Sequence, residues 1–177
     1  WPRCDRGPAP DHGSRIMSEE TTLEAYADKQ ELIDNIDEIF EGAVKDLLVE
    51  QPAVHVVLTG GTVGIALLEN IDPGNKLDWS RIHLWWGDER FVAADSQDRN
   101  AVQARQALLS RVAIPEENIH EFPAADGMLS LDDAAQLFEA ELAIHRPHFD
   151  LAFVGMGPDG HICSLFPGKA MHSPEAM

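Results

Sequence analysis

Three short segments of the sequence combine residue types suited to binding an anion and moving a proton. They are Gly60-Gly61-Thr62, Asp88-Glu89-Arg90 and the glycine-rich stretch GMGPDGH at 155–161. Each follows an apolar run typical of a buried strand. Each segment alone also has an ordinary structural interpretation, so the prediction of chemistry depends on all three meeting at one place.

The first segment is a candidate phosphate site. Gly60 and Gly61 permit a tight turn in which backbone N–H groups approach an anion closely, and Thr62 adds a hydroxyl. The pattern matches neither the P-loop nor the dinucleotide-binding GxGxxG motif. It predicts a site for one phosphate without a nucleotide, and a plain turn from strand to helix explains it equally well.

The second segment places two acids beside a guanidinium. Arg90 could bind a phosphate or a carboxylate through two parallel hydrogen bonds, with Asp88 or Glu89 orienting it. The alternative interpretation is an ion pair on the protein surface.

The third segment sets His161 in a glycine-rich turn that includes Gly157. The ordinary pKa of histidine suits proton transfer near neutral pH. Asp159, two positions earlier, could orient the imidazole ring or bind a substrate hydroxyl. A single histidine is more often structural, but this open setting favours a catalytic role.

The spacing of metal-binding residue types predicts no metal site, and no motif predicts a cofactor. His145, His148 and Asp150 resemble a metal cluster, but Pro147 separates the histidines and prevents the helical spacing of four. We therefore expect a solvated loop there.

The composition argues against several classes of partner. The 177 residues are 44% apolar and carry a net charge of −18, which disfavours nucleic acid and anionic membranes. No apolar stretch resembles a membrane span or a signal peptide, so a cytoplasmic location is expected. Cys4 and Cys163 form no disulfide framework, and Cys163 is expected to be a small buried residue.

The apolar patterns predict an α/β fold. Strands are expected at 54–59, 81–86 and 149–154, and helices at 28–49, 63–70, 100–109 and after a capping Ser130. The buried stripes are expected to be Leu32, Ile36, Ile39, Ala43 and Leu47 in the first helix, and Ala134, Leu137, Phe138 and Leu142 in the last. The alternation predicts a Rossmann-like parallel sheet with helices on both faces, whose carboxyl edge would gather the three segments into one crevice.

The chain is expected to divide into three parts. Residues 1–16, rich in Pro, Gly and Arg, are predicted to be a disordered extension, with Met17 as a candidate natural start. Residues 17–168 are predicted to form the α/β domain, and residues 169–177 an atypical tail.

The motifs resemble those of 6-phosphogluconolactonases. The resemblance lies in FDLAFVGMGPDGHICSLFPG at 149–168, WGDERFV at 86–92, and TGGT at 59–62, and it extends in order from about 23 to 168. This family belongs to a wider group with sugar-phosphate isomerases and glucosamine-6-phosphate deaminases. The family's sequences continue well past this region, so the resemblance implies that the sheet and the site are incomplete at the C-terminal end.

The resemblance implies hydrolysis of 6-phospho-D-glucono-1,5-lactone to 6-phosphogluconate, in the oxidative pentose phosphate pathway, without a metal or cofactor. His161 resembles the general base that activates water, and Asp159 its neighbour. The implied substrate-binding residues are Gly60, Gly61, Thr62, Asp88, Glu89, Arg90, Asn100 and Gly157. The implied partner is a small phosphorylated sugar lactone, not nucleic acid or a membrane.

Two other functions stay open. Deaminases usually have Asn at the position of Asp159 and Phe-Asn-Glu-Pro where this chain reads SLFP at 164–167, so both places favour a lactonase over an isomerase or deaminase. A sugar-phosphate-binding fragment without activity is the third interpretation.

Overall fold

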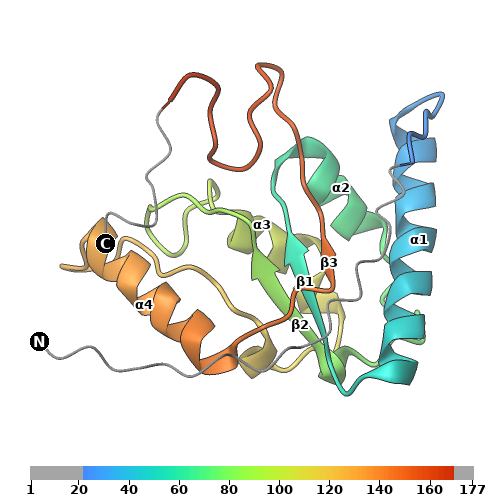
Figure 1. Cartoon of the computed structure of the whole chain (residues 1–177), viewed down its shortest axis with the longest axis horizontal. Helices are drawn as coiled ribbons and strands as arrows, with labels where there is room; N and C mark the ends of the chain where they lie inside the picture. The colour runs from blue at the N-terminus through green and yellow to red at the C-terminus, as the bar shows by residue number, and fades with distance from the viewer. Residues whose placement is uncertain (1–21, 170–177) are drawn as a thin grey trace, which may run out of the picture.

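Three parallel strands form the centre of the structure, a computed structural model that describes residues 22–169 (Figure 1). The middle strand is β1 (Val54–Leu58), which lies between β2 (Ile82–Trp86) and β3 (Leu151–Ala152). Val54 pairs with Ile82, and Val56 pairs with Leu151. The three predicted strands are therefore confirmed, although β3 is shorter than expected.

Within the described residues, four α-helices accompany the sheet: α1 (Lys29–Glu50), α2 (Gly61–Asn70), α3 (Asn100–Ala107) and α4 (Leu131–His145). Short 3₁₀ turns lie at Trp79–Arg81, Leu109–Arg111 and Glu116–Asn118. Local side chains start two of the helices, because Asp28 accepts from the N–H groups of α1 and Ser130 accepts from Asp133 N in α4. The predicted cap at Ser130 is thus confirmed.

The main core lies on one face of the sheet. Alternate strand residues, among them Val56 and Leu84, pack against apolar side chains of α1, α2 and α3. The other face carries His55, His83 and Trp85, and α4 covers it through an edge contact between Phe138 and Trp85. Figure 1 shows α4 on the opposite side of the strands from α1, so helices lie on both faces, as predicted.

Two predicted buried stripes need correction. In α1 the buried residues are Ile33, Phe40 and Val44, whereas Ile39 is 57% exposed. Because α1 packs on both β1 and α2, its buried face lies one position further along than the apolar spacing suggested.

In α4, Ala134 and Phe138 are buried as expected, but Leu137 is 55% exposed. The inward face of this helix continues through Glu141 and His145, which contact buried His120. Apolar contacts of Phe138 and polar contacts of Glu141 and His145 therefore orient α4 together.

The predicted extension at 1–16 and nearly all of the predicted tail lie outside the described residues. Within residues 22–169, no helix is both long and apolar enough to cross a membrane.

Candidate active site

A cavity of about 640 Å³ opens at the carboxyl ends of the strands. Figure 1 shows the segment after β3, in red, rising beyond the ends of β1 and β2. The three segments picked out in the sequence all reach this cavity. It is lined by Gly60, Gly61, Thr62, Asp88, Arg90, Asn100, Gly157 and His161, together with Thr59, Cys163 and neighbouring loop residues. Among the predicted site residues, Glu89 and Asp159 are not part of its lining.

The N-terminus of α2 forms one wall of the cavity. Gly60 is its N-cap residue and makes no side-chain capping bond, and Gly60, Gly61 and Thr62 all line the cavity. Gly61 has a φ of 79°, a conformation that glycine adopts without strain. Free N–H groups and the helix dipole together favour an anion at this place.

The glycine at position 60 is needed for a close approach by Asn100. A Cβ atom there would lie 1.9 Å from Asn100 Oδ1. Asn100 is further held by a hydrogen bond from its Nδ2 to the carbonyl oxygen of Asp88, at 3.1 Å. The amide of Asn100 is therefore fixed between the ends of β1 and β2, beside the phosphate-binding candidate.

Glu89 supports the site from behind and does not face the cavity. Its side chain is only 3% exposed, and its carboxylate accepts from the backbone N–H groups of Asn100 at 2.8 Å and Ala101 at 2.9 Å. The substrate-binding role expected for Glu89 stays a prediction, and its burial points to a supporting role instead. The carboxylate is occupied in capping α3, which positions Asn100.

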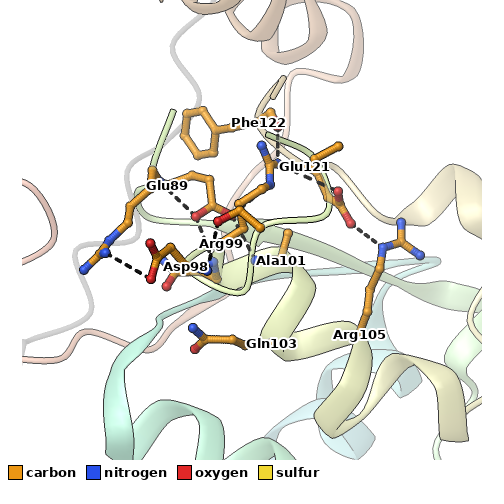
Figure 2. Close-up of polar contacts among 12 residues, drawn as sticks. Glu89, Asp98, Arg99, Ala101, Gln103, Arg105, Glu121 and Phe122 are labelled. Carbon is orange, nitrogen blue, oxygen red and sulfur yellow. Dashed lines mark hydrogen bonds and ion pairs between the residues drawn. The ribbon is translucent and has the colours of Figure 1, made fainter. Parts of the chain in front are cut away.

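Glu89 belongs to a buried polar network that the sequence motifs did not reveal (Figure 2). Arg99 is 2% exposed, lies 3.9 Å from Glu89 and donates to the carbonyl of Phe122 at 2.6 Å. Glu121 lies 4.0 Å from Arg99 and also pairs with Arg105. This network ties the loop after β2 to the segment around Phe122, and so fixes Asp88 and Arg90 relative to the sheet.

Arg90 keeps a largely free guanidinium at the cavity. It is 69% exposed, and its Nη1 lies 3.5 Å from an equally exposed Asp98. Such an exposed pair contributes little stability, so a phosphate could replace Asp98 at small cost.

His161 is positioned by its own turn. Its Nδ1 is hydrogen-bonded to Asp159, and its carbonyl accepts from Gly157 N at 2.8 Å. A Cβ atom on residue 157 would lie 2.1 Å from the Cε1 atom of His161, so only glycine permits this ring position. The hydrogen bond from His161 lowers the pKa of Asp159 and keeps it ionised as an orienting partner. Asp159 therefore acts on the cavity through His161.

Two neighbours in this turn were not picked out as site residues. Ser164 Oγ donates to Asp88 Oδ2 at 2.6 Å, which joins the turn to the end of β2. Cys163 is half-buried, and burial together with nearby Asp88 raises the pKa of its thiol. A raised pKa disfavours the thiolate, so the environment of Cys163 does not favour a nucleophilic role.

The residues that resembled a metal cluster do not form one group: His148 Nδ1 lies 3.4 Å from Asp150 Oδ1, but His145 belongs to another group. His148 is 92% exposed, whereas Asp150 is buried and accepts from His55 N at 2.8 Å. His145 instead lies beside Glu141, one turn earlier on α4, and beside His120, which comes from another part of the sequence. The spacing of four between Glu141 and His145 is visible along the chain, but only the fold brings His120 to them.

Comparison with known proteins agrees with the geometry of the cavity. The family described as glucosamine-6-phosphate isomerases/6-phosphogluconolactonase matches residues 27–176. The chain belongs to this family. The conclusion rests on a match that includes all three segments at the cavity.

Relatives of this chain include 6-phosphogluconolactonases from two mycobacteria. The protein from Mycobacterium leprae is 39% identical over 155 residues, which cover 82% of this chain and 63% of the relative. That from Mycobacterium tuberculosis is 39% identical, with 89% and 66% covered. The solved 6-phosphogluconolactonase from Thermotoga maritima superposes with a TM-score of 0.70 at 35% identity, covering 76% of this chain and 60% of that one. The chain thus spans somewhat less than two thirds of the length of these relatives.

Proposed function

We propose that this chain carries the reaction centre of a 6-phosphogluconolactonase, which hydrolyses 6-phospho-D-glucono-1,5-lactone to 6-phosphogluconate. The observation that supports this most is the placement of His161. Its ring lines the same cavity as the open N-terminus of α2 and the guanidinium of Arg90. A proton acceptor and an anion site thus share a space large enough for a phosphosugar.

His161 is the general base in this proposal. When Nδ1–H donates to Asp159, Nε2 carries the lone pair and can take a proton from water. The hydroxide attacks the lactone carbonyl to give a tetrahedral oxyanion. As the bond between the carbonyl carbon and the ring oxygen breaks, the imidazolium returns its proton to that oxygen, and the open-chain acid leaves. Asp159 stabilises the transient imidazolium.

The phosphate group would bind between α2 and Arg90. The chain carries a net charge of −18, so its overall field repels a phosphosugar and local groups must overcome it. The N–H groups of Gly61 and Thr62 and the exposed guanidinium of Arg90 supply positive potential there. Asn100 and Asp88 are positioned to bind sugar hydroxyls.

The same family description includes isomerases, so the reaction type needs a direct test. The chain is assayed with the lactone and with glucosamine 6-phosphate, and binding of 6-phosphogluconate is measured in parallel. Hydrolysis of the lactone above its spontaneous rate supports the proposal. Conversion of the amino sugar alone would favour an isomerase or deaminase, and binding without turnover would favour a binding fragment.

His161→Ala tests the mechanism within the same assay. We expect a loss of about 10²–10⁴-fold in turnover, the usual contribution of general base catalysis, with binding of 6-phosphogluconate retained. His148→Ala is the matched control, because His148 is exposed and lies outside the cavity. Undiminished turnover in His161→Ala would contradict the mechanism.

The proposed partner is the phosphorylated lactone alone, without nucleic acid or a membrane, and the proposed location is the cytoplasm. The charge of −18 supports the first part. A phosphosugar is charged and crosses a bilayer poorly, so the enzyme must share the compartment in which the sugar is made.

A further inference from the structure

The sheet face under α4 carries an unusual number of histidines. His55 and His83 stack at 4.6 Å between ring centroids, and His83 Nδ1 lies 3.0 Å from His120 Nε2. The face would ordinarily bury apolar side chains, and burying polar rings costs free energy unless they have partners. Several imidazole rings in contact on this face therefore indicate a role beyond packing.

Two residues of α4 complete the group at its outer edge. Glu141 and His145 are one helical turn apart and continue the inward face begun by Ala134 and Phe138. Glu141 Oε1 lies 2.8 Å from His120 Nδ1 and 3.3 Å from His145 Nε2. Three atoms that can each donate a lone pair therefore converge, all within 4.8 Å of one another.

These distances suit a tetrahedral metal ion. With bonds of about 2.1 Å to zinc, neighbouring ligand atoms lie about 3.4 Å apart, close to the 3.3 Å between Glu141 and His145 and within about 0.6 Å of the 2.8 Å between Glu141 and His120. Two imidazoles and one carboxylate are also a ligand set that zinc uses in proteins. The side chains of Glu141 and His145 are 39% and 33% exposed, which leaves an entry path and room for water as a fourth ligand.

Residues behind the group already hold His120 in a metal-binding orientation. Its backbone N–H donates to Leu84 O at 2.9 Å, and Trp85 stacks on its ring at 3.8 Å. His120 Nε2 lies 3.0 Å from His83 Nδ1, so with a metal bound a proton on Nε2 would donate to His83, while Nδ1, which faces Glu141 at 2.8 Å, would give up its proton and bind the metal. Metal-binding histidines are commonly oriented by such a hydrogen bond on the other ring nitrogen.

We propose that His120, Glu141 and His145 bind one divalent transition-metal ion of the zinc class, at a site that ties α4 to the edge of the sheet. None of the three lines the cavity at the carboxyl ends of the strands, so the site is separate from the proposed reaction centre. Its role is to stabilise the fold, because a ligand bound only by the folded state raises the free energy of unfolding. The proposal does not depend on lactone hydrolysis.

The test is a titration of the metal-free chain with Zn²⁺. Calorimetry measures binding, and the melting temperature measures the change in stability. We expect saturable binding of one ion at this site and a higher melting temperature. Glu141→Gln and His145→Ala should each weaken binding by at least about tenfold, the loss seen even when a residue that merely orients a ligand is removed. Both residues are partly exposed, so the variants should fold, and circular dichroism without metal checks this.

His148→Ala is the control for nonspecific binding by histidine. It is fully outside the group and 92% exposed, so its Zn²⁺ affinity should equal that of the wild type. Absence of saturable Zn²⁺ binding in the wild type would overturn the proposal. The three side chains would then be linked by hydrogen bonds only. Unchanged affinity in both Glu141→Gln and His145→Ala, or an equal loss in His148→Ala, would overturn it too.

Discussion

Replacing Gly157 by alanine tests whether activity depends on the ring position that the turn gives His161. The added Cβ would lie 2.1 Å from Cε1 and 2.3 Å from Nδ1 of His161. Gly157 does not have a positive φ, so alanine brings no backbone strain of its own. The neighbouring turn is exposed, so the substitution should shift the ring and leave the core intact.

The size of the effect follows from this contact. Ordinary carbon contacts begin at about 3.4 Å, so the ring must withdraw by about 1.3 Å. A displacement of about 1 Å in a catalytic group costs on the order of 10²-fold in rate, or about 2.7 kcal/mol in the barrier. We therefore expect Gly157→Ala to lower turnover of the lactone by about 10²-fold, with binding of 6-phosphogluconate nearly unchanged.

Two comparisons make this prediction sharp. In the His161→Ala background, Gly157→Ala should cost almost nothing further, because both act through one ring. Gly42→Ala, in α1, is the matched substitution without a clash, and it should leave turnover unchanged. NMR of the His161 ring supplies a readout that does not need turnover, since the Asp159 hydrogen bond should be lost. Full activity in Gly157→Ala, or an equal loss with and without His161, would refute the reasoning.

Three further outcomes are expected. Arg90→Ala should weaken phosphosugar binding by about 1.5–3 kcal/mol, the scale of a hydrogen bond to a charged group, and equal weakening for an unphosphorylated lactone would show that Arg90 is structural. Glu89→Ala should lower the free energy of unfolding in urea by about 3–5 kcal/mol, because it removes one of the two carboxylates near buried Arg99 and the acceptor of the first N–H groups of α3. Asp98→Ala on the same loop should change it by less than about 0.5 kcal/mol. In buffer with a chelator, the free energy of unfolding should fall as pH drops from about 6.5 towards 4, because burial lowers the pKa of His83 to about 4 and also lowers those of His55 and His120. The unfolded chain then binds more protons than the folded one, so a flat profile over this window would contradict the burial of these rings.

Short-range features of the sequence determined most of the fold. Apolar runs of five or six residues located the strands, because strands buried on both faces need continuous apolar character. Ser130 marked the start of α4, because its hydroxyl satisfies an N–H group within the same turn. The same local logic placed the three chemical segments at strand ends, and the parallel sheet then brought them to one cavity.

Only the tertiary structure decided which face of a helix is buried. The apolar spacing of α1 allowed two neighbouring stripes, and contact with both β1 and α2 selected the one through Phe40 and Val44. In α4, packing against the sheet turned Leu137 outwards and Glu141 inwards. A helix can present adjacent faces at similar intrinsic cost, so its partners make the choice.

The three-dimensional arrangement also separated acids that look equivalent in the sequence. Asp88 and Glu89 are neighbours, yet one lines the cavity and the other caps α3 beneath it. His120 and Glu141, 21 positions apart, meet at 2.8 Å. Sequence motifs report short spacings along one chain segment. Contacts between distant segments depend on how the sheet and helices pack, and this is why the sequence by itself located the segments that line the cavity but not the cluster under α4.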